Sequence, residues 1–115
     1  MSDTKQLSHY IDGQWVAGPA ASDSLNPSDT RDVVAKVPGG DKNTVNAAVS
    51  AAKAAYPAWA AASPEVRSDL LDKVGSLIMA RADDLGRLLS REEGKTFPEG
   101  KGEVMRAARD RKSVV

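Results

Sequence analysis

The chain has 115 residues, a length typical of one domain and too short for most multi-part enzymes. Sixteen Lys and Arg residues balance sixteen Asp and Glu residues, so no net charge attracts nucleic acid or an acidic membrane surface. There is no cysteine, which excludes disulfides, thiolate metal sites and a cysteine nucleophile from this chain. Leu, Ile, Val and Phe supply only 22 residues against 18 alanines, and so poor a core is more natural for part of a larger fold.

The first 40 residues predict short strands and turns. An Asp-Gly pair between β-favouring residues predicts a hairpin over 10–16. Asn-Pro-Ser-Asp at 26–29 predicts a turn, and 32–37 predicts a strand that the following Pro-Gly-Gly ends. Because these strands carry few apolar residues, we expect the β segment to be poorly held by itself, with Trp15 partly exposed.

The rest of the chain predicts helices, because apolar residues recur three and four positions apart. They are expected at 42–56, 64–81, 84–93 and 98–109. Asp41 is expected to cap the first helix, and Pro57 to kink or end it near residues 55–56. Asp83 or Asp84 is expected to cap the third helix, and Gly94 to end it.

The predicted fold class is α+β, with short N-terminal β-strands followed by four helices. We expect an N-terminal β/turn segment at 1–40, a helical part at 41–109 and a divergent tail at 110–115, where the apolar period is lost. The helical pair around Leu71 and Leu88 is expected to be the best-ordered part.

Several motifs that carry chemistry are incomplete. Gly-Lys-Thr at 94–96 lacks the glycine that a phosphate loop needs five positions earlier, where Leu89 stands, so we interpret it as a helix end and the next helix's start. His9 is the only histidine, which excludes a His-based metal site or a Ser-His-Asp triad. Glu92 and Glu93 are adjacent on a helix and should point about 100° apart, so a solvated or helix-pairing role is favoured over catalysis.

In order and spacing, eight short stretches resemble the N-terminal part of the NAD(P)-dependent aldehyde dehydrogenase superfamily. They are YIDGQWV at 10–16, NP at 26–27 with the strand at 32–37, VNAAVSAA at 45–52, Trp59, SPEVR at 63–67, REEGKT at 91–96, Glu99 and GEV at 102–104. The resemblance runs from about residue 10 to 108 and implies a piece of the α/β aldehyde dehydrogenase fold, in which 41–109 is the helical part of an incomplete cofactor-binding domain. The residues Asp-Val-Val at 32–34 and Glu-Glu-Gly-Lys-Thr at 92–96 are most similar to those of semialdehyde-oxidising members, such as those acting on 2-oxoglutarate semialdehyde.

The resemblance implies that an aldehyde is oxidised to a carboxylic acid with NAD or NADP. In the family a cysteine thiolate attacks the aldehyde, hydride passes to the nicotinamide and water hydrolyses the thioester. The catalytic residues and nearly all cofactor contacts of the family lie downstream of this region. This chain alone is therefore expected to bind no cofactor and to be inactive. An aldehyde substrate is expected only for a full-length family member. The resemblance further implies a monovalent cation near the backbone of Leu25 and the side chain of Glu92.

The similarity stops near Arg109, which we interpret as a truncation or a reading-frame break. The alternative is a small helical protein-interaction module that binds a partner through its apolar stripes, and a nucleic-acid-binding helical protein is disfavoured by the zero net charge. Neither a targeting signal nor a membrane segment is predicted, so the expected location is the cytoplasm. Self-association through exposed apolar helix faces is expected.

Overall fold

The computed structural model describes residues 4–19 and 21–110. The strands are β1 (Lys5–Gln6), β2 (His9–Ile11), β3 (Gln14–Val16), β4 (Ala21–Asn26) and β5 (Asp29–Pro38), and the helices are α1 (Lys42–Ala61), α2 (Pro64–Ala80), α3 (Ala82–Glu93) and α4 (Phe97–Arg109). Strands before residue 40 and four helices after it confirm the predicted α+β class, and 64–93 holds no strand. No helix in the described ranges is long and apolar enough to cross a membrane.

The chain divides into two compact units, Met1–Ala61 and Ala62–Val115. The first therefore holds the strands and α1, and the second holds α2, α3 and α4. The expected division into domains at 1–40, 41–109 and 110–115 stays a prediction. Residues 111–115 of the expected tail lie outside the described residues.

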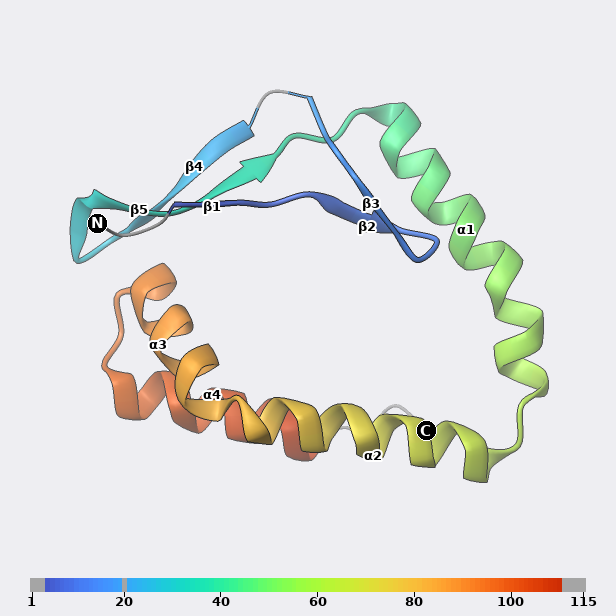
Figure 1. Cartoon of the computed structure of the whole chain (residues 1–115). Coiled ribbons are helices and arrows are strands. Elements are labelled where there is room, and N and C mark those ends of the chain that lie inside the picture. The colour runs from blue at the N-terminus through green and yellow to red at the C-terminus, as the bar shows by residue number, and fades with distance from the viewer. Residues whose placement is uncertain (1–3, 20, 111–115) are drawn as a thin grey trace. The chain divides into compact units, whose positions relative to one another are not determined.

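A three-stranded sheet forms the centre of the first unit. β5 lies between β1, which runs parallel to it, and β4, which runs antiparallel (Figure 1). Among the sheet residues whose burial is described, the buried side chains are those of Val34, 5% exposed, and Ala35, 8% exposed, both in β5. β1 and β4 were not expected from the sequence. Ser22, Asp23 and Ser24 have low strand propensity, and their strand conformation comes from pairing with β5.

The predicted hairpin forms between β2 and β3. His9 pairs with Val16 and Ile11 with Gln14, and both turn residues have positive φ, 52° at Asp12 and 72° at Gly13. This left-handed pair is what a two-residue hairpin turn requires. Trp15 lies 4.8 Å from Tyr10 between ring centroids and is 75% exposed, which confirms its expected exposure.

Helix α1 begins as predicted but is longer than predicted. The Thr44 backbone N–H donates to the Asp41 carboxylate at 2.8 Å, which caps the first turn. The helix then continues through Pro57 to Ala61. The prediction that it ends near residues 55–56 was therefore wrong. Pro57 removes one donor, but nine of the twenty residues of α1 are alanine, the strongest helix former, and none of its residues is buried. Water can therefore satisfy the freed carbonyl.

The second unit opens with a capped α2 that leads directly into α3. The Ser63 hydroxyl accepts a hydrogen bond from the Val66 backbone N–H at 3.3 Å. Arg81 both ends α2 and precedes α3, so neither Asp83 nor Asp84 is the cap that we expected. Both acids lie instead in the first turn of α3, where their negative charges interact favourably with the positive end of the helix dipole.

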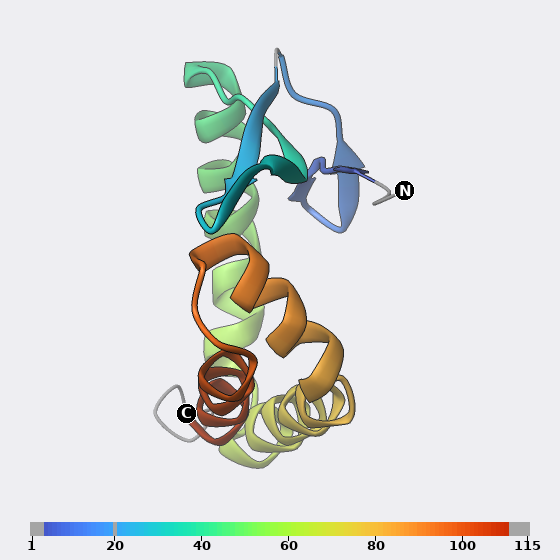
Figure 2. The same ribbon diagram turned by 90° about the vertical axis from the view of Figure 1, so that its left-hand side faces the viewer.

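Helices α2 and α4 lie side by side, and α3 crosses them (Figure 2). The buried apolar side chains here are small: Ala82, Val104 and Ala108. Glycines bring α3 and α4 close together, since a Cβ atom placed on Gly86 would lie 2.8 Å from the Cα atom of Lys101. This close packing fixes the turn that joins the two helices.

Candidate functional site: the turn between α3 and α4

The turn over 94–96 is a helix end followed by a helix start. Gly94 adopts φ 73°, and its backbone N–H donates to the Ser90 carbonyl at 2.8 Å. Only glycine adopts this conformation without a steric cost, so it ends α3. Thr96 is then the N-cap of α4. A helix, α3, leads directly into the turn where a phosphate loop needs a strand, which confirms the interpretation as a helix end and the next helix's start.

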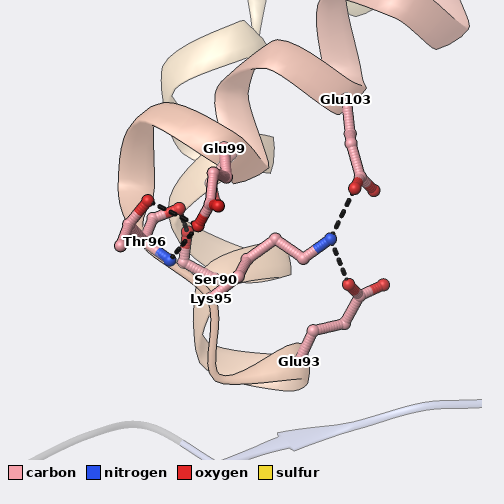
Figure 3. A network of polar contacts seen from close by, with 7 residues as sticks. Ser90, Glu93, Lys95, Thr96, Glu99 and Glu103 are labelled. Atoms are coloured by element: carbon pink, nitrogen blue, oxygen red, sulfur yellow. Dashed lines mark hydrogen bonds and ion pairs between the residues drawn. The ribbon is translucent and has the colours of Figure 1, made fainter.

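Glu99 closes the first turn of α4. Its carboxylate accepts hydrogen bonds from the Thr96 backbone N–H at 3.1 Å and from the Thr96 hydroxyl at 2.7 Å. These bonds stabilise the charged form and lower the pKa of the Glu99 carboxyl. The Ser90 hydroxyl lies 3.1 Å from the Thr96 carbonyl oxygen and 2.9 Å from the Gly86 carbonyl oxygen, and these two acceptors share its one proton, which ties the turn back to α3 (Figure 3).

Lys95 is held between two carboxylates. Its ammonium group lies 2.6 Å from the Glu103 carboxylate on α4 and also pairs with Glu93 at the end of α3 (Figure 3). The hydrogen bond to Glu103, and then that to Glu93, raises the pKa of Lys95. The Glu93–Lys95–Glu103 arrangement links two helices, which fits the helix-pairing role expected for Glu93.

The Lys95 contacts were missed in the sequence, although a signal for them existed. Thr96 and Glu99 form the T-x-x-E pattern of a capping box. Once Glu99 is placed at that turn, Glu103 follows one helical turn later on the same face and so comes near Lys95. The α3–α4 turn is further held by the Arg87 guanidinium, which lies 4.7 Å from the centroid of the Phe97 ring.

An apolar groove lies on the same unit. Its cavity measures about 280 Å³ and is lined by Ile78, Leu85, Leu88, Leu89, Glu92, Val104 and Ala107. Glu92 and Glu93 therefore face different surroundings, as their spacing predicted: Glu92 lines the groove and Glu93 pairs with Lys95. Leu88 remains 45% exposed in this groove.

The two residues of the expected cation site belong to different units. Leu25 is in β4, at a shift of register against β5, and Glu92 is exposed in α3. Within the described ranges, no three His, Asp or Glu side chains gather as metal ligands. The cation site stays a prediction. The polar network of the turn orders two helices, and the Thr96 hydroxyl within it serves the helix cap through its bond to Glu99.

Comparison with known proteins identifies the family. The sequence profile of the aldehyde dehydrogenase family matches residues 15–113. The chain therefore belongs to the aldehyde dehydrogenase family, as the resemblance predicted. The alternative of a small helical interaction module gains no support from this match.

Similar proteins include semialdehyde dehydrogenases. Malonate-semialdehyde dehydrogenase 3 of Geobacillus kaustophilus is 36% identical over 92% of this chain and 22% of its own length. Alpha-ketoglutarate semialdehyde dehydrogenase of Haloferax volcanii is 36% identical over 90% of this chain and 22% of its own. The crystal structure of a putative methylmalonate-semialdehyde dehydrogenase from Sinorhizobium meliloti 1021, complexed with NAD, superposes with a TM-score of 0.86 at 36% identity and covers 99% of this chain and 23% of that one.

The chain thus spans about a fifth of the length of the curated relatives that it matches. The matched region is the N-terminal part of these proteins.

Proposed function

We propose that this chain supplies the N-terminal strand-and-helix frame of a semialdehyde dehydrogenase. The complete protein would oxidise an aldehyde to a carboxylic acid with NAD or NADP. The observation that carries the proposal is the match of nearly the whole chain to one family, together with its superposition on the semialdehyde dehydrogenase structure that holds NAD. A substrate with one carboxylate besides its aldehyde is favoured, because the Geobacillus kaustophilus and Haloferax volcanii relatives are named for semialdehydes of that kind.

The reaction needs groups that this chain does not carry. When bound, the nicotinamide cofactor accepts the hydride that leaves the aldehyde carbon. The family's attacking thiolate must come from another segment, because none of the 115 residues is cysteine. What these residues offer is a rigid pair of helices, α3 and α4, locked by the turn at Lys95 and Thr96.

The cation expected from the resemblance is part of this proposal. The pairing of β4 with β5 shifts register on both sides of Leu25, and a bulge of this kind turns backbone groups away from regular pairing. Glu92 has an exposed carboxylate, a ligand suited to a hard cation. We propose that the Leu25 carbonyl and the Glu92 carboxylate bind a monovalent cation in the complete enzyme. Loss of stabilisation by sodium or potassium in a Glu92→Gln variant of the chimera described next would support this.

A chimera tests the proposed function. The segment of the Geobacillus kaustophilus enzyme that aligns with this chain is replaced by this chain, and reduction of NAD and NADP is followed with malonate semialdehyde. We expect cofactor reduction by the chimera and none by the isolated chain. A folded chimera without activity, beside an active parent enzyme, would contradict the proposal. Comparing malonate semialdehyde with 2-oxoglutarate semialdehyde would then rank the substrate classes.

The proposal also covers location and assembly. We place the complete enzyme in the cytoplasm. We expect the isolated chain to self-associate, because large side chains of α1 such as Val49 and Tyr56 are exposed. Light scattering on the purified chain would measure this, and a monodisperse monomer at high concentration would contradict it.

A further inference from the structure

The apolar groove of the second unit is built from three helices. Ile78 comes from α2, Leu85, Leu88 and Leu89 come from α3, and Val104 and Ala107 come from α4. On α3 the lining residues are spaced by three, four and seven positions, so they form one continuous face. This spacing is the one with which a helical surface receives the apolar face of another helix.

The groove is open although its lining is apolar. Leu88 is 45% exposed, whereas the only charged lining residue is Glu92. Within the second unit no described element covers it, because α2, α3 and α4 are themselves its walls. An open groove lined by leucines indicates a docking surface.

The comparisons show that this backbone occurs in proteins with much further chain. The same backbone occurs, at a TM-score of 0.86, inside a protein chain of which this chain covers only 23%. The residues of the groove all lie within 15–113, the part that matches the aldehyde dehydrogenase family. More than three quarters of such a protein lies outside the part that this chain covers, and this remaining chain is the occupant that we infer for a hollow of about 280 Å³.

We propose that this groove seats the apolar face of a helix from the part of an aldehyde dehydrogenase that this chain lacks. The inference rests on the proposed function and deepens it by naming the surface through which the frame joins the rest of the enzyme. Leu88 is the central contact, because it is the most exposed of the large lining residues.

Two matched substitutions test the groove. Leu88→Lys places a charge in the groove. The new ammonium group stands four residues before Glu92 on the same face of α3, so the two opposite charges attract and the helix itself is preserved. Met79→Lys is the control. Met79 is similarly exposed, at 39%, is not among the residues that line the groove, and lines a separate hollow with Asp83 and Lys101.

Both variants are made in the isolated chain and in the chimera, and helix melting is followed by circular dichroism. We expect Leu88→Lys to lower the melting temperature of the chimera by about 5 °C or more and Met79→Lys to change it by only about 1 °C. In the isolated chain neither should shift the melting curve by more than about 1 °C, because nothing then occupies the groove.

Each other outcome overturns the inference in a distinguishable way. A chimera in which Leu88→Lys is as harmless as Met79→Lys overturns the groove alone and leaves the proposed function in place. An equal loss in the isolated chain shows that Leu88 acts only within the unit. A dimer of the isolated chain that Leu88→Lys dissociates assigns the groove to a second copy. A chimera that does not fold overturns the proposed function, and this inference with it.

Discussion

Gly86 and Gly100 face each other where α3 and α4 are in close contact: a Cβ atom on Gly100 would lie 2.7 Å from the Gly86 carbonyl oxygen. That distance is shorter than any real Cβ contact tolerates, and the obstacle is backbone that cannot turn away. We therefore expect Gly100→Ala to destabilise the second unit by about 1–2 kcal/mol, the overpacking cost less the gain in helix propensity. Urea unfolding followed by circular dichroism measures it.

Gly102 provides the matched control in the same helix. A Cβ atom there meets nothing within 4 Å, so Gly102→Ala gains helix propensity without a clash. We expect it to stabilise α4 by about 0.5–1 kcal/mol. If both substitutions changed stability in the same direction, the close approach of the helices would not be the reason.

The carboxylate of Glu99 makes the stability of α4 depend on pH. Its pKa is lowered in the folded chain by the hydrogen bonds from Thr96, below the ordinary value of 4.5. A lowered pKa gives stability that is complete above 4.5 and is lost as the pH falls through the folded value. We expect the difference between wild type and Glu99→Gln to be largest at neutral pH and to shrink below pH 4.5. A difference that stays constant from neutral pH to below 4.5 would contradict this.

Local signals in the sequence predicted much of this fold. The Asp-Gly turn, the Asp41 cap and the Gly94 helix end each depend on one or two residues, and the structure confirms all three. β4 was missed because its strand conformation depends on pairing with β5. Pro57 misled because a single unfavourable residue was weighed above a run of alanines.

The candidate site was predictable only in part. The end of α3 at Gly94 follows from its sequence, but the contacts of Lys95 depend on how closely two helices pack. That packing comes from glycines, which carry no apolar signal in a hydrophobic pattern. The expected cation site joins residues of two units, so no local pattern could test it.

The turn of the β2–β3 hairpin depends on Gly13. Its φ of 72° strains any residue with a Cβ atom, while no neighbouring atom lies within 4 Å. We expect Gly13→Ala to destabilise the hairpin by about 1 kcal/mol through backbone strain alone. Trp15 fluorescence should report it, because the ring lies against Tyr10. An unchanged signal and unchanged amide exchange in the hairpin would contradict it.

The isolated chain should not oxidise aldehydes. Without a cysteine, the family's thioester route has no starting group. Purified chain incubated with NAD or NADP and a panel of semialdehydes is expected to reduce no cofactor above the blank. Reduction that persists through repurification would refute this expectation.

Hydrogen exchange on the isolated chain and on the chimera tests the central claim most directly, namely that this chain is a frame whose exposed faces are covered by the rest of an aldehyde dehydrogenase. The β5 amides at 33–37 should exchange fast in the isolated chain, compared with the α2 amides at 70–78, because only Val34 and Ala35 are buried there. In the chimera both groups should be strongly protected. Strong and equal protection of both groups already in an isolated monomer would show an independently stable domain and contradict the account.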